Sequence, residues 1–231
     1  MKEVVVIGVG DSGSGKSSFG NLYLNKQCFD ESDSPDPCTK NPIFQQNEID
    51  GMIRKYYDTE GHCDGNSVTS KQIQKLAIYL SEQNPLVNSV AIILNGQCPR
   101  FSQGVKDLIK FAYVSFGGEK VLGYICIVFT MCFSILPNNP NRNKRREEYK
   151  EHAMKYLSEI SGIKDIPEVP VFFVDCKDPS GEETKTNLIQ FHGWSVSRKP
   201  ITLNPELIRP PDDITEEETE FEAERVIEDD I

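Results

Sequence analysis

The clearest chemistry in this chain belongs to Gly10–Ser17, which satisfies the pattern G-x-x-x-x-G-K-[ST] of a P-loop. The glycines let the backbone turn tightly, so that successive amides point at the α- and β-phosphates of a nucleotide. Lys16 can reach the β- and γ-phosphates as a point charge, and the Ser17 hydroxyl can ligate Mg²⁺. We therefore predict a nucleotide-phosphate site whose residues are Gly10, Asp11, Ser12, Gly13, Ser14, Gly15, Lys16, Ser17 and Ser18.

A second motif, Asp58-Thr59-Glu60-Gly61, follows a predicted strand over residues 52–58. A carboxylate at Asp58 can hold Mg²⁺ through its bound water, and Gly61 lets a backbone amide approach the γ-phosphate. Taken alone, Asp-x-x-Gly also fits an ordinary turn at the end of a strand. Its position behind a P-loop favours the metal interpretation.

The loop over residues 27–41 lies between the two motifs and is rich in Asp, Ser and Pro. Thr39 can supply a second hydroxyl to Mg²⁺, and Ser32 and Ser34 are alternatives in the same loop. Cys38 is too soft a ligand to compete for this hard cation. We predict a metal site formed by Ser17, Thr39 and Asp58.

The elements that must position these motifs alternate between strands and helices. The strand before the P-loop is apolar and the stretch after it is amphipathic, which is the context that the motif requires. Apolar runs predict a first strand through Val9 and further strands over 43–49, 52–58, 90–94, 122–129 and 169–174. Helical spacing predicts helices over 16–24, 70–82, 105–112, 145–160 and 182–190.

This order predicts a three-layer α/β fold, with a mostly parallel six-stranded sheet covered by helices on both faces. One antiparallel strand comes from the early hairpin, because Asp50-Gly51 joins the second and third strands. Ligands of such a sheet bind beyond the carboxyl ends of its strands.

The acidic charge of the chain is uneven. The net charge is −11, but the stretch from Pro211 to Ile231 alone holds eleven acidic residues and one Arg. We therefore predict one domain over 1–204 and an acidic tail over 205–231 that is disordered or loosely helical. A nearly neutral body and an acidic tail argue against a nucleic-acid partner.

Two further features bear on the compartment. The longest apolar run, Val121–Leu136, is shorter than the ~20 residues needed to cross a bilayer, so we predict no transmembrane segment. Seven cysteines, an odd number without framework spacing, are typical of reduced thiols in a cytoplasmic protein.

The chain resembles the avirulence-induced-gene (AIG) family, also called GTPases of immunity-associated proteins (GIMAP), whose relatives include septins and the chloroplast import GTPases. The resemblance covers roughly residues 3–200. It rests on the P-loop with Gly20-Asn21 after it, on Cys38-Thr39-Lys40, Asp58-Thr59-Glu60-Gly61, Arg100-Phe101-Ser102, Phe116-Gly117-Gly118 and Ile127-Val128-Phe129-Thr130. The box at Arg100-Phe101-Ser102 is the part most particular to this family.

The resemblance implies a G domain that binds GTP or GDP with Mg²⁺. It further implies a molecular switch that hydrolyses GTP slowly, forms homodimers that depend on the nucleotide, and contacts an effector protein through ordered loops. Two alternatives stay open: a P-loop ATPase or small-molecule kinase with relaxed base specificity, and a scaffold that binds nucleotide without hydrolysing it.

The base-reading segment departs from the family pattern. GTPases read guanine with the Asp of an Asn/Thr-Lys-x-Asp motif, whereas this chain has Thr130-Met131-Cys132-Phe133-Ser134. Neither Phe133 nor Ser134 can supply a bidentate carboxylate, although Thr130 keeps the first position of the motif. Asp175, after the last predicted strand, is a candidate replacement; the alternative is that it simply terminates that strand.

The catalytic residues also depart from the pattern. His62 stands where small GTPases carry a Gln that orients the attacking water, and a neutral imidazole can do that work. The resemblance makes Arg100 the natural donor of positive charge to the γ-phosphate, in cis or across a dimer. The alternative for His62 is a surface histidine without a catalytic role, and the alternative for Arg100 is an arginine that makes an ordinary surface ion pair.

Overall fold

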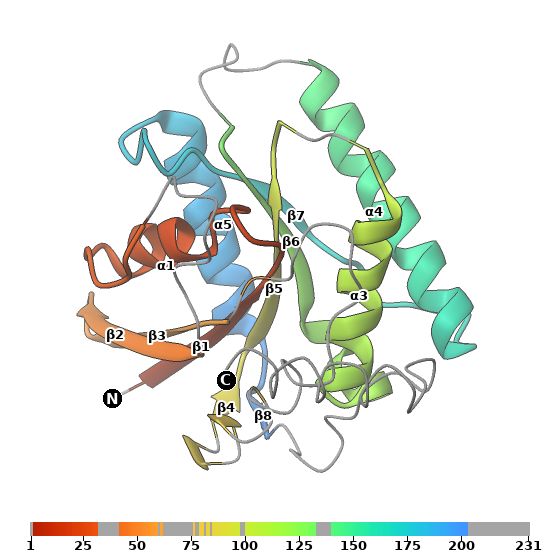
Figure 1. Ribbon diagram of the computed structural model, residues 1–231, viewed down its shortest axis with the longest axis horizontal. Coiled ribbons are helices and arrows are strands. Elements are labelled where there is room, and N and C mark those ends of the chain that lie inside the picture. Colours follow the sequence, from red (N-terminus) through yellow and green to blue (C-terminus); the bar gives the residue numbers. More distant parts are fainter. Residues whose placement is uncertain are drawn as a thin grey trace, which may run out of the picture.

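The computed structural model describes residues 2–31, 42–59, 61, 76, 79–80, 82–83, 85–97, 100–132 and 140–202, with the backbone alone at 140–142. Its strands are β1 (Lys2–Val9), β2 (Ile43–Ile49), β3 (Met52–Asp58), β4 (Leu86–Val87), β5 (Ser89–Asn95), β6 (Ile125–Thr130), β7 (Val171–Phe173) and β8 (Ile201–Thr202). Its helices are α1 (Lys16–Leu24), α3 (Gln103–Ser115), the 3₁₀ helix η1 (Gly118–Tyr124), α4 (Pro140–Ser161) and α5 (Glu182–Ser197), as Figure 1 shows.

Six strands form the main sheet, in the order β2-β3-β1-β5-β6-β7. Only β2 runs antiparallel, paired with β3 through a turn at Asp50 (φ 52°) and Gly51 (φ 73°). Both residues are left-handed, as a two-residue type I′ hairpin requires. The predicted architecture, including the Asp-Gly turn and the antiparallel strand, is confirmed.

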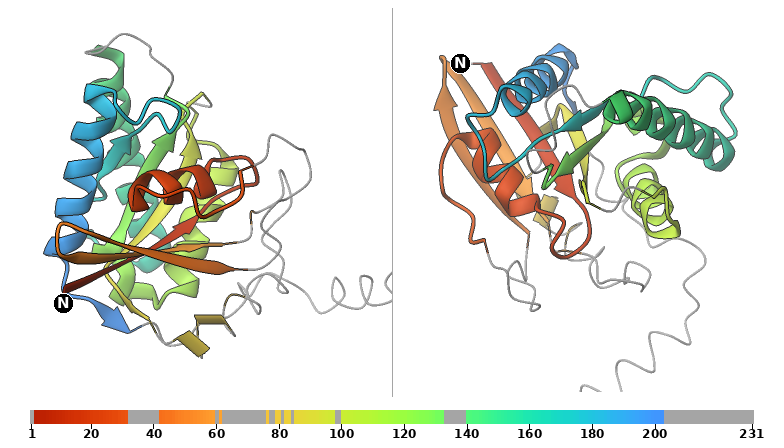
Figure 2. Two further views of the ribbon diagram at one scale, coloured as in Figure 1. Left: turned by 90° about the vertical axis from the view of Figure 1, so that its left-hand side faces the viewer. Right: turned by 90° about the horizontal axis from the view of Figure 1, so that it is seen from above.

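Helices cover both faces of the sheet, with α1 and α5 on one face and α3 and α4 on the other (Figures 1 and 2). On the first face, the ring of Phe191 meets Phe19 and Tyr23 edge-to-face at centroid distances of 5.2 and 5.4 Å. These contacts hold α1 against α5, and the edge-to-face contact of Phe19 with Tyr56 of β3, at 5.9 Å, holds α1 against the sheet. The helix that follows the P-loop is therefore held by its buried aromatic side rather than by helix propensity alone.

The prediction of a strand over 122–129 was wrong at its beginning, because η1 occupies Gly118–Tyr124 and β6 starts at Ile125. Gly117 and Gly118 have φ of 113° and 61°, so they end α3 in a conformation that a longer side chain rarely adopts. Val121 and Leu122 are nevertheless buried. An apolar run therefore marked core residues correctly without distinguishing a strand from a tight helix.

Three other elements begin or end a few residues away from their predicted bounds. The helix predicted over 145–160 begins earlier, at Pro140, a residue well suited to a first helical turn. The helix predicted to end at 190 continues to Ser197, and the last strand is limited to Val171–Phe173. The predicted helix over 70–82 is described only at scattered positions, and the predicted tail lies outside the described residues.

A small two-stranded sheet, β4 with β8, was not predicted. This small sheet brings the end of the described chain close to β1. Asn88 links β1 to the residue that follows α5: its Oδ1 accepts from the Val5 amide at 2.9 Å, and its Nδ2 donates to the Arg198 carbonyl at 3.1 Å. Across the described ranges, no helix is both long and apolar enough to span a membrane.

Candidate nucleotide-phosphate site

The P-loop connects the carboxyl end of β1 to the first turn of α1. Gly13 and Gly15 have φ of 72° and 89°, a left-handed region in which glycine is favoured. A Cβ on Gly15 would lie only 2.9 Å from the Thr130 hydroxyl, so the loop backbone packs directly against the end of β6. The two glycines thus produce the close, curved backbone that a phosphate cradle needs.

Lys16 is buried, and its ammonium folds back on the P-loop itself. The Nζ atom donates to the Gly10 carbonyl at 3.0 Å and to the Asp11 carbonyl at 2.9 Å. Burial lowers the pKa of Lys16, while the negative charges of Asp58 and Asp11 oppose that shift. The cation is positioned at the mouth of the loop, where phosphate oxygens can replace the two carbonyls.

Ser17 and Asp58 meet as the metal prediction requires. The Ser17 hydroxyl donates to Asp58 Oδ2 at 2.7 Å, joining the first turn of α1 to the end of β3. Asp58 is fully buried. A hydroxyl and a carboxylate are hard oxygen donors, so this pair fits Mg²⁺. Thr39, the third predicted ligand, lies outside the described residues, as do the alternatives Ser32 and Ser34.

Residues after β3 also contact the phosphate loop. The Thr59 hydroxyl donates to the Gly8 carbonyl at 2.8 Å, which fixes the chain as it leaves the strand. Gly61 then lies so close to the P-loop that an added Cβ would come within 2.9 Å of the Ser12 amide nitrogen. The predicted approach of Gly61 is consistent with this geometry. His62 lies outside the described residues.

Tyr56, for which the sequence predicted no role, supports the first turn of α1. Its hydroxyl donates to the Lys16 carbonyl at 3.1 Å, and its ring lies between β1 and α1. A Cβ on Gly8 would be 1.9 Å from that hydroxyl, and one on Gly20 would be 2.6 Å from the ring. A glycine inside a strand, such as Gly8, signals a close approach of this kind, but it does not identify the neighbour.

Asn21 and Glu31 organise the start of the loop that follows α1. Asn21 accepts from the backbone amides of Cys28 and Phe29 at 2.9 Å each, and its amide donates to Glu31 at 2.6 Å. Glu31 also accepts from the Ser18 hydroxyl at 2.6 Å. The side chain of Ser18 therefore serves this network, and only its backbone amide is left to serve the predicted phosphate site.

Thr130 lies between the P-loop and the ends of two central strands. Its buried hydroxyl is within hydrogen-bonding distance of the Ser14 carbonyl and, at 3.2 Å, of the Leu94 carbonyl. It thereby ties the loop to the ends of β5 and β6. Met131 follows with φ of 52°, a left-handed conformation that is uncommon outside glycine. The chain turns sharply at this point.

Asp175 lies two residues after the end of β7. Its hydrogen bonds are those of a residue that terminates a strand, which is the alternative to a contact with the base. Its Oδ1 accepts from the Lys177 amide at 2.9 Å, and its own amide donates to the Thr184 hydroxyl at 3.1 Å. The segments after β6 and β7 are adjacent, since the Cys132 amide donates to the Val174 carbonyl at 3.3 Å. Asp175 therefore lies close to the segment that follows β6, and one of its carboxylate oxygens is already used by the turn.

Arg100 is exposed, and its neighbours anchor the segment that carries it. The ring of Phe101 packs against Tyr149 and His152 of α4, at centroid distances of 5.5 and 5.3 Å. Ser102 caps α3 by accepting from the Val105 amide at 3.4 Å. Within the part of the chain that the structure describes, the Arg100 guanidinium makes no hydrogen bond or ion pair, so it is not joined to the P-loop of its own chain.

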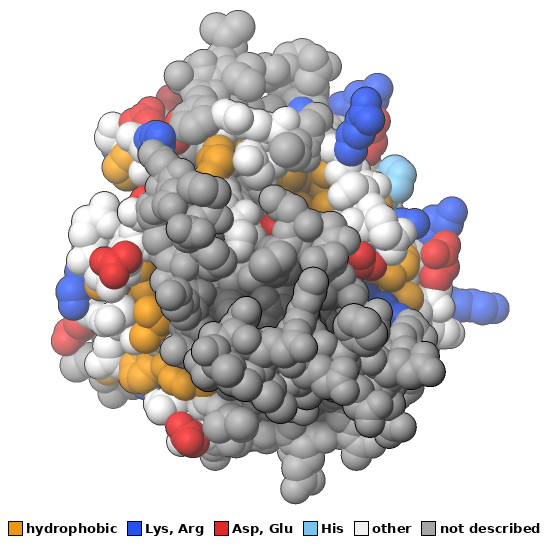
Figure 3. Space-filling view, in the orientation of Figure 1, with side chains coloured by type: hydrophobic (Ala, Val, Ile, Leu, Met, Phe, Trp, Pro, Cys, Tyr) orange, Lys and Arg blue, Asp and Glu red, His pale blue; other side chains and the backbone are white. Residues whose placement is uncertain are grey.

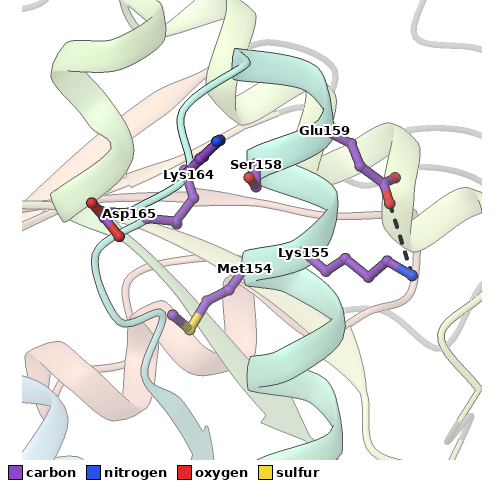
Figure 4. Close-up of a pocket in the computed structure, with 7 residues that line it drawn as sticks. Met154, Lys155, Ser158, Glu159, Lys164 and Asp165 are labelled. Atoms are coloured by element: carbon purple, nitrogen blue, oxygen red, sulfur yellow. Dashed lines mark ion pairs between the residues drawn. The ribbon is translucent and has the colours of Figure 1, made fainter.

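An open hollow of about 530 Å³ lies elsewhere, beside the last turns of α4 (Figure 4). The charged side chains around it are exposed, and Lys155 pairs with Glu159 at 4.0 Å along the helix. Figure 3 shows Lys and Arg side chains mixed with Asp and Glu where α4 lies. Exposed ion pairs of this kind contribute little to stability. The end of α4 is also at the opposite edge of the sheet from the P-loop.

A P-loop between the first strand and helix, a carboxylate at the end of β3 and this strand order define a P-loop GTPase G-domain fold. The chain belongs to the AIG1 family, whose model matches residues 3–161. The family resemblance that the motifs predicted is thereby confirmed.

Solved structures share the fold at low sequence identity. Toc33 from Arabidopsis thaliana, in complex with GDP and Mg²⁺, is 18% identical, with 88% of each chain covered and a TM-score of 0.69. Its complex with Mg²⁺ and GMPPNP is also 18% identical, covering 88% of this chain and 89% of that one, with a TM-score of 0.68. Era from Aquifex aeolicus, bound to GDP and AlF4⁻, is 13% identical, covering 87% of this chain and 58% of its own, with a TM-score of 0.57.

Proposed function

We propose that this protein is a guanine-nucleotide-binding switch that holds GTP or GDP with Mg²⁺ and hydrolyses GTP slowly. The observation that carries the proposal is the hydrogen bond between Ser17 and Asp58, made directly beside the buried ammonium of Lys16. Membership of the AIG1 family supports it, as do the Toc33 structures, which contain GDP or GMPPNP together with Mg²⁺.

The side chains of the phosphate site exchange internal partners for the ligand. Lys16 gives up the Gly10 and Asp11 carbonyls and donates to phosphate oxygens, which are stronger acceptors because they are charged. Ser17 would hold Mg²⁺ through its hydroxyl oxygen, and Asp58 would hold it through its carboxylate. When bound, Mg²⁺ neutralises charge that develops on the phosphates.

Hydrolysis, in this proposal, depends on a second copy of the chain. Arg100 is exposed and follows the carboxyl end of β5, at the same edge of the sheet as the P-loop. For the chloroplast translocon components atToc33 and psToc159, dimerization is important for the GTPase activity. We therefore expect Arg100 to supply positive charge across a dimer. The expected setting is the cytoplasm, with an effector protein as a further partner.

The preference for guanine over adenine is the part of the proposal for which a specific alternative exists. Guanine follows from the family, with Asp175 as the carboxylate that accepts from the base. A P-loop ATPase or kinase with relaxed base specificity is favoured by one observation, the bond that already occupies Asp175 Oδ1. Calorimetric titration with GDP, GTP, ADP and ATP separates the two. Guanine nucleotides should bind at least about tenfold more tightly, whereas equal affinities would support the relaxed alternative.

A kinetic experiment tests the dimer. GTP turnover per molecule should rise with protein concentration, and Arg100→Ala should abolish that rise, because an arginine of this kind contributes up to ~10³–10⁵ in rate. Lys144→Ala is the control, since Lys144 is also cationic and exposed. Turnover that is independent of concentration, or unchanged by Arg100→Ala, would contradict catalysis across a dimer.

A further inference from the structure

The main sheet ends in two edge strands, β2 and β7, and side chains close the edge at β7. The Val171 carbonyl accepts from Arg146 Nε at 3.2 Å, and the Phe173 amide donates to Asn187 Oδ1 at 3.0 Å. Arg146 also donates to that Asn187 oxygen at 3.3 Å, and its guanidinium lies over the Phe173 ring. These backbone groups of β7 are therefore occupied, so they are not available to pair with another strand.

The edge at β2 lies on the opposite side of the sheet (Figures 1 and 2). Pairing with β3 determines which backbone groups of β2 point outward. Ile49 is opposite Met52 across the two-residue turn, so Ile49 and every second residue before it form hydrogen bonds with β3. The residues between them, Phe44, Gln46 and Glu48, direct their amide N–H and carbonyl groups away from the sheet.

A side chain covers only one end of this outer edge. The Phe44 amide donates to the Tyr79 hydroxyl at 2.9 Å, which agrees with its outward direction. The Tyr79 ring is itself held by an edge-to-face contact with Tyr57 at 6.1 Å. Gln46 and Glu48 are exposed, and among the described residues nothing bonds to their outward backbone groups. A strand that approaches β2 therefore finds free donors and acceptors at these two residues.

The side chains of β2 favour a second copy of the same strand as the occupant. In an antiparallel pair with Gln46 opposite itself, the Phe44 amide would be needed, but Tyr79 already holds it. With Glu48 opposite itself, two carboxylates would lie side by side and repel each other. With Asn47 on the two-fold axis, Gln46 of each copy lies opposite Glu48 of the other, and its side-chain amide can donate to that carboxylate.

We propose that β2 pairs antiparallel with β2 of a second copy of this chain, around Asn47, through reciprocal backbone hydrogen bonds between Gln46 and Glu48. The pairing makes the two sheets continuous, which is a common way to occupy a sheet edge. It uses no residue of the phosphate site, so it does not rest on the proposed function and needs no nucleotide. Because the contact is narrow, we expect a weak dimer that forms at micromolar to millimolar protein concentrations.

Analytical ultracentrifugation of the whole chain, with no nucleotide added, tests the dimer. The wild-type chain should associate reversibly as its concentration rises. Gln46→Pro should raise the Kd for association about tenfold or more, because half of the backbone hydrogen bonds between the copies are lost. Proline is tolerated at an edge position whose N–H faces outward, so the variant should keep its fold. Gln46→Ala, the matched control, keeps the N–H and should change this Kd less than about threefold.

Cross-linking through an introduced cysteine tests the register without a proline. In this register Asn47 lies opposite itself in a non-hydrogen-bonded pair, where the Cβ atoms are about 4.5–5.5 Å apart and close to disulfide geometry. Under mild oxidation, Asn47→Cys should therefore form a reducible disulfide between two copies. Ile43→Cys is the control, because Ile43 is exposed but lies at opposite ends of the paired strands in the two copies.

Three outcomes would overturn the inference. A wild-type chain that stays monomeric at millimolar concentration would do so, and would leave this edge to an extended segment of another protein. Association that Gln46→Pro leaves intact would place the dimer contact elsewhere. Cross-linking of Ile43→Cys as efficient as that of Asn47→Cys would contradict the register. Arg100→Ala should leave the association unchanged, which separates this contact from the nucleotide-dependent dimer of the proposed function.

Discussion

The phosphate half and the base half of the candidate site use their polar side chains differently. In the phosphate half, Lys16 and the Ser17–Asp58 pair bond to one another or to the loop at 2.7–3.0 Å, and each contact is one that a nucleotide or metal can replace in kind. In the base half, Thr130 holds the P-loop to the sheet and Asp175 caps a turn. The polar groups of the first half can therefore be taken over by a ligand, whereas in the second half Thr130 supports the P-loop and Asp175 stabilises its own turn.

The largest effect should come from Lys16→Ala, which removes the one buried cation of the described phosphate half. Affinity for GDP and for GTP should fall more than about a hundredfold, since each hydrogen bond to a charged group contributes about 1.5–3 kcal/mol and Lys16 is placed to make more than one. Calorimetry measures the loss. Lys155→Ala removes an exposed lysine of α4 and should leave both affinities unchanged. If Lys16→Ala still bound both nucleotides with wild-type affinity, the assignment of the P-loop as the phosphate site would be contradicted.

Asp58→Asn should have a smaller and more selective effect. The amide keeps an acceptor for Ser17 but removes the negative charge that would hold the metal's water. We expect Mg²⁺ to lose its ability to tighten GDP binding, a change of about tenfold, while affinity without Mg²⁺ is retained. Asp107→Asn alters a partly exposed carboxylate of α3, which accepts from Gln103, and serves as the control. A variant that still responds fully to Mg²⁺ would contradict the metal assignment.

The smallest effect is expected in the base half. Asp175→Ala should weaken GTP about three- to tenfold and leave ATP unchanged if the carboxylate accepts from guanine, since the turn already uses one of its oxygens. Asp178→Ala changes a neighbouring carboxylate that binds Ser180 and is the control. If the ratio of GTP affinity to ATP affinity were unchanged, Asp175 would serve the turn alone. The base half would then contain no described carboxylate that binds the nucleotide, unlike the phosphate half.

The parts of the fold that the sequence predicted well carry local signals. The first helix and the β2–β3 hairpin begin and end at the predicted residues, because glycines and an Asp-Gly turn bound them. The strand predicted from residue 122 begins at Ile125 instead, because the chain forms the 3₁₀ helix η1 after the left-handed glycines that end α3. Pairing of β4 with β8 depends on segments more than a hundred residues apart, which no local pattern records.

The candidate site divides in the same way. The meeting of Ser17 with Asp58 could be predicted, because neighbouring parallel strands bring their carboxyl ends together. The roles of Tyr56 and Asn21 could not, because each depends on a tertiary contact: a tyrosine ring between β1 and α1, and an amide that holds the chain after α1. Similarly, only the packed structure shows that the Thr130 hydroxyl faces the Ser14 carbonyl.

The P-loop and Asp58 together form, as we propose, a working nucleotide and metal site. Its most direct test is a calorimetric titration of the whole wild-type chain with GDP, in the presence and in the absence of Mg²⁺. We predict saturable binding of one GDP per chain that Mg²⁺ strengthens, because Ser17 and Asp58 are placed to hold the metal. No detectable binding of GDP under either condition would contradict the account.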